Sequence, residues 1–406
     1  QWRGPRRDAI CTETGLLKTW LAGGPKLLWK TNGLGRGYAS PIITGERMFV
    51  AGDVGDHCII FSLDTSGSHV WQATNGASWK GPYIGARASC AYRDGRLYHL
   101  NAHGRVACWE AASGKELWSV NVKERFGGKI NTWGYSECLL VNDGRVIVTP
   151  GGTSALMAAL DAKTGATVWT TPPLLLGPSE NPAHQRATEP AGEADPASYA
   201  SPILFTREGR PQLVNCSQRH LFGVDARTGA LLWTRPLQTR YLVIASTPVL
   251  VQDAVFATAP DTEQAALHRF QNTATGLSVT NLWTTKLDTC SGGLIAIGDS
   301  IFGAWYRPHG GRGFGCLDAR TGEVKYFTKD LAKGSLLYAD GLLYCLSDEG
   351  EMALLKPTAT GFEFAGRFQF VKEPNKDVWA HPVILDRKLY LRWQDTLSCY
   401  DIKAGE

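Results

Sequence analysis

The sequence predicts an all-β protein built as an eight-bladed β-propeller of four-stranded antiparallel blades. Three observations support this prediction: the composition, a short turn motif that recurs along the 406 residues, and a last repeat that lacks its fourth strand. The chain has 45 glycines, 20 prolines and 14 tryptophans but only 3 methionines, which favours many strands and turns over long helices. With 43% hydrophobic residues and no low-complexity segment, it is not a disordered chain.

The recurring motif is an acidic residue, two variable residues, Thr or Ser, Gly, and an aromatic residue four positions after the glycine. Clear copies lie at 161–169, 225–233 and 318–326, and looser copies lie at 64–71 and 110–118. The acid can cap the turn, and the glycine can adopt the positive φ that a short hairpin needs. Each copy therefore predicts a hairpin between the last two strands of a blade.

Two more strands precede each copy, as in 40–50 and 137–148, and Asp-Gly pairs mark the reversal between them at 94–95, 143–144 and 340–341. A blade therefore has four strands. The outer strands carry eight aromatic residues, which predict eight blades: Trp29, Trp71, Trp118, Trp169, Trp233, Trp283, Tyr326 and Phe368. We interpret these rings as packing between blades rather than as an active site.

The two ends of the chain predict how the propeller closes. The last repeat runs from His381 to Gly405 without a fourth strand, whereas Leu27 to Trp29 has a fourth-strand pattern with no strands before it. Residues 25–31 are therefore expected to complete the last blade and to leave no large exposed sheet edge. The predicted organisation is an N-terminal extension over 1–24 and a single propeller over 25–406, with a long insertion loop at 171–198.

Charge and hydropathy exclude two classes of partner. The formal net charge is +4, and the 42 Lys and Arg are scattered among 38 Asp and Glu, so no clustered nucleic-acid footprint is expected. No apolar run approaches the ~18–20 residues of a membrane span, and no signal segment opens the chain. We predict a soluble protein that binds neither nucleic acid nor a membrane core.

The candidate site lies where the connections into the first strands and the loops between second and third strands share one face. Aligned first strands place Glu137 and His381 on one ring of otherwise small residues, with Arg87 two positions before another member. A carboxylate and an imidazole can act as general base and acid, and a guanidinium can neutralise an anion. Four aromatic residues are the predicted walls for a ligand such as a sugar: Tyr38, Tyr135, Tyr199 and Trp379.

Each of these residues also has a structural interpretation. Glu137 can pair with Arg87, and His381 can hydrogen-bond a neighbouring blade. Direct contact between Glu137 and His381 is not expected, because their blades are three steps apart around the ring.

Three loops add further candidates. Arg307, His309 and Arg312 lie in a glycine-rich stretch that we interpret as an anion cradle or as an exposed loop, and His220 lies in a shorter loop of the same kind. The insertion loop at 171–198 is a predicted lid or docking loop.

The Leu-Asp-Ala-Lys-Thr-Gly-x-x-x-Trp type of motif, repeated between residues 29 and 405, resembles the pyrroloquinoline-quinone (PQQ)-like propeller repeat. That family includes quinoprotein alcohol dehydrogenases and the outer-membrane assembly lipoprotein of the bacterial β-barrel machine. The segments at residues 2–8, 132–137 and 333–336 resemble those of a branch of secreted or periplasmic proteins that is abundant in planctomycetes and verrucomicrobia. The resemblance implies the fold and a periplasmic or extracellular location, but not an activity.

The cysteines argue against the dehydrogenase chemistry that this resemblance offers. Those enzymes place a disulfide between adjacent cysteines over the quinone and a calcium or lanthanide ion beneath it, but no two of the ten cysteines here are adjacent, and no haem-attachment motif occurs. We therefore predict no cofactor, neither PQQ nor calcium, and no metal, although Asp53, Asp56 and His57 offer oxygen and nitrogen ligands. Most cysteines are expected to be free, buried thiols, with a disulfide through Cys11 left open.

The leading prediction is a propeller that binds a small-molecule or carbohydrate ligand, or a protein partner, at its loop face without a quinone. One alternative is a carbohydrate-active lyase or hydrolase at the same mouth, and another is a protein-assembly scaffold; a PQQ-dependent dehydrogenase is the least favoured. An enzyme predicts converging titratable groups in a deep pocket, whereas a scaffold predicts a shallow surface with an apolar patch.

Overall fold

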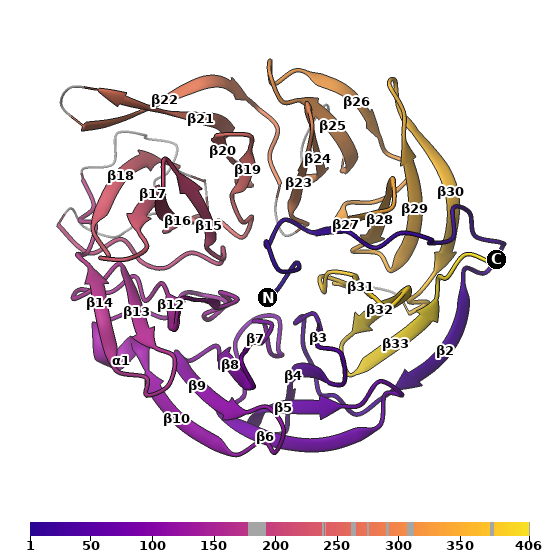
Figure 1. Ribbon diagram of the computed structural model, residues 1–406, viewed down its shortest axis with the longest axis horizontal. Helices are drawn as coiled ribbons and strands as arrows, with labels where there is room; N and C mark the ends of the chain where they lie inside the picture. Colours follow the sequence, from indigo (N-terminus) through magenta and orange to yellow (C-terminus); the bar gives the residue numbers. More distant parts are fainter. Residues whose placement is uncertain are drawn as a thin grey trace. The chain divides into compact units, whose positions relative to one another are not determined.

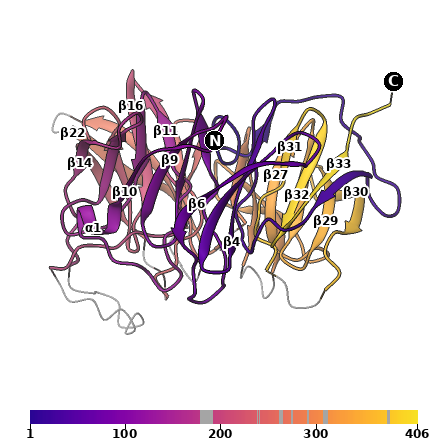
Figure 2. The same ribbon diagram turned by 90° about the horizontal axis from the view of Figure 1, so that it is seen from below.

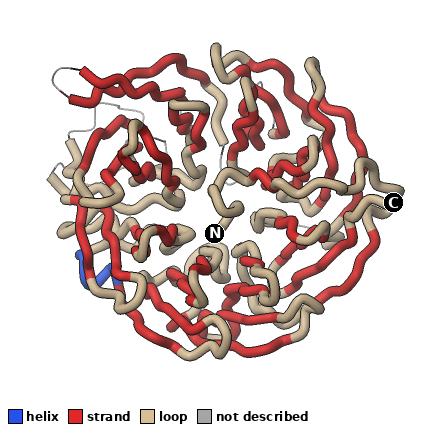
Figure 3. Tube along the Cα trace, viewed as in Figure 1, coloured by secondary structure: helices blue, strands red, loops and turns tan. Residues whose placement is uncertain are grey.

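The computed structural model describes residues 1–177, 192–237, 239, 241–260, 265–273, 276–289, 292–306, 312–373 and 377–405. Within these residues it has thirty-three strands and one short helix, α1 (Val122–Phe126). Figure 3 shows strands in red and helix in blue along the chain. The strands form eight sheets, each with four antiparallel strands, and this confirms the all-β eight-bladed propeller. The chain forms two compact units, residues 1–90 with 291–406 (unit 1) and residues 91–290 (unit 2), so the single domain expected over 25–406 stays a prediction.

Unit 1 contains four of the blades (Figure 1). Its strands are β3 (Ile42–Ile43), β4 (Met48–Val54), β5 (His57–Leu63) and β6 (His69–Ala77); β23 (Leu294–Ile297), β24 (Ser300–Trp305), β25 (Gly313–Asp318) and β26 (Val324–Thr328); β27 (Gly334–Ala339), β28 (Leu342–Ser347), β29 (Glu351–Pro357) and β30 (Phe362–Gln369); and β31 (Val383–Leu385), β32 (Lys388–Trp393), β33 (Thr396–Asp401) and β2 (Lys26–Thr31). A short strand, β1 (Ile10–Cys11), adds to β27 in parallel.

Unit 2 contains the other four blades. Its strands are β7 (Ala91–Arg93), β8 (Arg96–Leu100), β9 (Arg105–Glu110) and β10 (Glu116–Asn121); β11 (Leu140–Asn142), β12 (Arg145–Val148), β13 (Met157–Asp161) and β14 (Thr167–Thr171); β15 (Ile203–Arg207), β16 (Arg210–Cys216), β17 (His220–Asp225) and β18 (Leu231–Pro236); and β19 (Val249–Val251), β20 (Ala254–Ala257), β21 (Ala265–Thr273) and β22 (Gly276–Thr285).

The N-terminal strand completes the last blade, as the sequence predicts. β2 pairs antiparallel with β33, and Trp29 lies opposite Cys399. In Figure 2 the indigo β2 lies beside the yellow β33. The pairing gives the backbone groups of β33 their hydrogen-bond partners and joins the two ends of the chain in one sheet.

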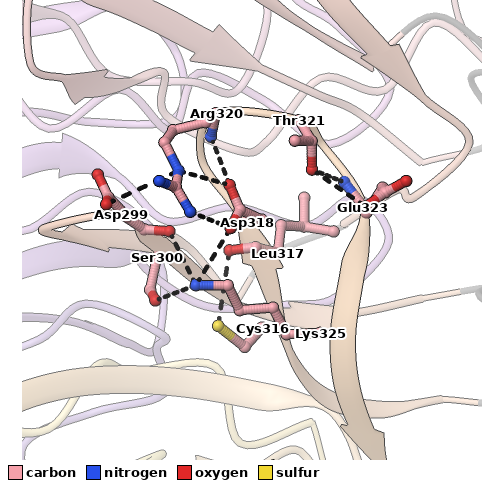
Figure 4. Close-up of polar contacts among 9 residues, drawn as sticks. All are labelled: Asp299, Ser300, Cys316, Leu317, Asp318, Arg320, Thr321, Glu323 and Lys325. Atoms are coloured by element: carbon pink, nitrogen blue, oxygen red, sulfur yellow. Dashed lines mark hydrogen bonds and ion pairs between the residues drawn. The ribbon is translucent and has the colours of Figure 1, made fainter. Parts of the chain in front are cut away.

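The repeated turn has the predicted acid cap. Figure 4 shows the copy at Asp318, whose carboxylate accepts a hydrogen bond from the Arg320 backbone N–H at 2.8 Å and lies 3.4 Å from the Lys325 ammonium. The hydrogen bonds from Arg320, with the charges of Arg320 and Lys325, lower the pKa of Asp318 to about 2. The carboxylate therefore stays ionised and caps the turn, in which Gly322 has a φ of 75°.

The motif glycine also makes room for the aromatic residue of the preceding blade. A Cβ at Gly165 would lie 2.6 Å from the Trp118 ring, and a Cβ at Gly229 would lie 2.5 Å from the Trp169 ring. The Trp118 indole donates to the Ala162 carbonyl at 3.1 Å. These tryptophans thus pack between successive blades of unit 2, which agrees with the structural role predicted for them.

Several sequence expectations have a simple structural outcome. No helix among the described residues is long and apolar enough to cross a membrane. The described cysteines are free thiols, all buried except the partly exposed Cys11, and Cys290 lies outside the described residues. Of the insertion loop, residues 178–191 also lie outside them, while its ends approach each other through a bridge between Leu175 and Ala194.

Candidate functional site

Unit 1 brings three predicted site residues, Tyr38, Arg87 and Trp379, close to one another. They lie beside Tyr83, which the sequence did not mark as a site residue. The ring centroids of Tyr38 and Trp379 lie 4.8 Å apart, and those of Tyr83 and Trp379 lie 5.0 Å apart. We call Tyr38, Trp379 and Tyr83 the aromatic stack. Its members come from the connections that lead into β3, β31 and β7, which is the face predicted from the sequence. Tyr83 is 46% exposed, so the stack presents an aromatic surface.

Arg87 holds the loop that carries Tyr83. Its guanidinium donates to the carbonyls of Gly85 and Pro82, both at 2.6 Å, and lies 5.2 Å from the centre of the Trp79 ring. Tyr83 itself has a φ of 56°, a conformation that side-chain-bearing residues avoid unless their surroundings impose it. Arg87 is thus a positioning residue for the aromatic stack.

A fully buried arginine fixes the segment that carries Tyr38. The Arg392 guanidinium donates to the carbonyls of Ala39 at 2.7 Å and Ala51 at 2.6 Å, and burial lowers its pKa to about 10. Burial also raises the pKa of Tyr38, whose hydroxyl interacts with Gln394, so the phenol stays protonated at neutral pH. The stack therefore rests on a rigid, hydrogen-bonded base.

His381 is buried rather than open at the mouth. Its backbone N–H donates to the Ser40 hydroxyl at 2.7 Å, which links it to the next blade, in line with the structural interpretation. The Trp2 ring meets the imidazole edge-on, with 5.1 Å between the centroids. The N-terminal segment therefore covers the side chain that the sequence offered as an acid or base.

Glu137 and Tyr135 are interior residues of unit 2. The Glu137 carboxylate accepts hydrogen bonds from the backbone N–H of Thr149 at 2.7 Å and from its hydroxyl at 3.2 Å. The Tyr135 hydroxyl donates to the Pro150 carbonyl at 3.0 Å, and burial raises its pKa. Because Glu137 lies in unit 2 and Arg87 and His381 in unit 1, convergence of the three stays a prediction.

The remaining unit 2 candidates lie on loops. The Tyr199 ring packs edge-on against Trp133 at 5.6 Å between centroids. The His220 Nδ1 lies 2.7 Å from a carboxylate oxygen of the buried Asp195, which also accepts from the Ser217 hydroxyl. Asp195 therefore orients the His220 imidazole and holds its loop.

The predicted anion cradle is only partly described. Arg307 and His309 lie outside the described residues. The exposed Arg312 guanidinium lies 5.1 Å from the centre of the Tyr306 ring, and the Lys333 ammonium lies 5.8 Å from the same ring. Two cations thus share one aromatic side chain at this edge of unit 1.

Two of the three candidate metal ligands pair with other groups. Asp53 accepts from the Trp79 backbone N–H at 2.9 Å, and Asp56 pairs with the Lys80 ammonium at 3.0 Å. Across the described residues, no group of three or more His, Cys, Asp or Glu side chains is placed to hold a metal ion.

The eight four-stranded sheets and the family match place the protein in the PQQ-like class of propellers. The family model described as outer membrane protein assembly factor BamB matches residues 57–326, and the chain belongs to this family. No curated protein sequence matches the chain.

Solved structures agree on the fold. BamB from Moraxella catarrhalis is 15% identical with a TM-score of 0.63, over 94% of this chain and 98% of that one. The quinohemoprotein alcohol dehydrogenase from Comamonas testosteroni is 13% identical with a TM-score of 0.65, over 99% and 79%. The computationally designed Ika8 protein is 10% identical with a TM-score of 0.57, over 93% and 100%. At these identities the similarity concerns the fold alone.

Proposed function

We propose that this protein is a periplasmic or extracellular binding propeller that holds a ligand or partner on the aromatic stack, without a quinone. The observation that carries the proposal is Tyr83, half exposed at a φ of 56° in a loop fixed by Arg87. A rigid aromatic side chain loses little conformational entropy when it is covered, so it contributes more of its contact energy to binding.

A protein partner is the occupant that the surface favours. Ile84, next to Tyr83 in the chain, is 45% exposed, and its aliphatic side chain offers a sugar no hydrogen bond. Tyr, Trp and Arg are the residues that most often dominate the energy of protein interfaces. Membership in a family described as an assembly factor points in the same direction.

A carbohydrate ligand, with or without turnover, is the second candidate. It is favoured by Asp377, two residues before Trp379, because burial and the negative charge of Asp348 raise its pKa. A carboxyl group with a raised pKa close to aromatic rings is a feature of general acids that act on sugars. The surroundings of Glu137 and His381 favour a binding protein over an enzyme. The Glu137 carboxylate is hydrogen-bonded inside its own blade, and the His381 imidazole is covered by Trp2.

The experiment uses peptide and glycan arrays with the full chain. Wild type, Tyr83→Ala and Trp379→Ala are compared with Tyr241→Ala, which removes a tyrosine of equal exposure (46%) in unit 2. We expect the first two variants to lose at least ~10-fold in affinity for any hit, which is about 1.4 kcal/mol, and the control to bind as wild type does. Equal binding by all four proteins would refute the proposal. Turnover of a glycan hit that Asp377→Asn abolishes would establish the enzyme alternative.

A further inference from the structure

The first residues of the chain lie in unit 1 like a docked peptide. We call residues 2–11 the strap. Ile10 and Cys11 pair in parallel with Tyr338 and Ala339 of β27, and the Tyr338 N–H donates to the Ala9 carbonyl at 2.9 Å. Figure 1 shows this indigo segment beside β27. Addition of an extended segment to the edge of an existing sheet is a common mode of peptide recognition.

Two side chains anchor the strap ahead of this strand. Trp2 packs edge-on against the imidazole of His381. Arg3 is 8% exposed, and its guanidinium donates to the Leu294 carbonyl. A Cβ at Gly293 would lie 3.0 Å from the His381 ring and 3.3 Å from the Arg3 guanidinium carbon. The glycine thus leaves space for both side chains. The β27 edge, Gly293, Leu294 and His381 form what we call the strap groove.

The strap is held under conformational strain. Arg3, Arg7 and Ala9 have φ values of 61°, 60° and 60°, all in the left-handed region that residues with a side chain avoid. Its strand contributes only two residue pairs to the sheet. Both features weaken the hold of the strap relative to a segment that could sit in the groove without such strain.

The chain is anchored separately just after the strap. The Glu13 carboxylate accepts hydrogen bonds from the backbone N–H groups of Asp386 at 2.9 Å and Arg387 at 2.7 Å, and Leu16 and Trp20 are buried in the core. Thr12 lies exposed between the strap and these anchors. The strap can therefore leave its groove while β2 and the last blade stay in place.

We propose that the strap groove is a peptide-binding site, occupied in cis by the strap, that accepts in trans a polypeptide carrying a Trp-Arg pair, a compact turn like that closed by the Ala9 N–H and the Arg3 carbonyl, and then a short strand. Trp packs on His381, Arg reaches the Leu294 carbonyl, and the following strand pairs with β27. The partner that fits is a cationic segment of another polypeptide chain, extended only where it pairs with β27. This site uses none of the aromatic stack and is independent of the function proposed above.

The test uses the full chain with Trp2→Ala and Arg3→Ala, which loosens the strap and leaves the groove intact. Binding of a fluorescein-labelled peptide of residues 1–13 is followed by anisotropy, with Arg6→Ala as the control because its guanidinium is mostly exposed. We expect the double variant to bind the peptide at least tenfold more tightly than wild type and the control do, and a peptide with alanine in place of Trp2 to bind at least tenfold more weakly. A double variant that is folded by circular dichroism but binds neither peptide would overturn the proposal.

Hydrogen exchange on wild type gives a second test that does not depend on the variant. The N–H of Tyr338 is hydrogen-bonded to the strap, whereas β28 is paired with β27 on one side and β29 on the other. We expect the Tyr338 amide to exchange at least tenfold faster than the amides of β28. Equal protection would mean that the strap does not detach, and the groove would then be ordinary core packing.

Discussion

Protonation of His268 should destabilise the fold in mildly acidic solution. His268 lies on β21 and is 4% exposed, and its pKa is lowered from 6.5 to about 4, first by burial and then by the charge of Arg235. Above pH 6.5 the imidazole is neutral in both the folded and the unfolded chain, so its contribution to stability is fully present. Between pH 6.5 and 4 His268 binds a proton in the unfolded chain but stays neutral in the folded chain, so the free energy of unfolding falls.

The magnitude follows from the shift. A change of one pKa unit corresponds to ~1.4 kcal/mol, so the full shift is about 3 kcal/mol, of which about 2.5 kcal/mol is lost by about pH 4.5. The assay is urea unfolding of wild type and His268→Gln at about pH 7.5 and 4.5, with His69→Gln as an exposed control. The free energy of unfolding of His268→Gln should fall by about 2.5 kcal/mol less than that of wild type over this range. Parallel losses in all three proteins would refute the reasoning.

Three further predictions concern stability and reactivity. Arg392→Met should lower the free energy of unfolding by ~3 kcal/mol or more in urea, because it removes the buried guanidinium that donates to the Ala39 and Ala51 carbonyls. A loss below ~1 kcal/mol would contradict the bracing role of Arg392. Gly52→Ala should cost ~2 kcal/mol or more by the same measurement, since its Cβ would lie 1.8 Å from the Leu34 carbonyl oxygen, while Gly45→Ala, with open space around it, should cost less than ~0.5 kcal/mol. In a Cys290→Ser background, a thiol reagent should label Cys11 first, because the other described cysteines are buried, and simultaneous labelling in the native protein would contradict this.

The blades could be predicted because their signals are local. The acid of each turn motif caps backbone N–H groups two and three residues away, as Asp161 does for Lys163 and Thr164, and the glycine supplies the positive φ in the same turn. The closing strand could be predicted from the missing fourth strand, because a blade edge at β33 needs a partner.

The site could be predicted only in part. The choice of loop face placed Tyr38, Trp379 and Arg87 in one region, and the structure brings them together. Tyr83 was missed, because its exposure and strained backbone depend on hydrogen bonds from Arg87 that no sequence pattern encodes. For His381 the sequence left a role at the site and a structural role open, and it did not predict that Trp2, from the opposite end of the chain, covers the imidazole.

The sequence by itself determined the number of blades, their strand order and the way in which the last sheet is completed. These features depend on turns and alternating side chains within a few residues, which repeat often enough to be recognised. Only the tertiary structure decided which polar residues are used inside the fold, such as Glu137, and which aromatic residues reach its surface, such as Tyr83. The reason is that burial and pairing of a side chain depend on segments far away along the chain, whose meeting no local pattern specifies.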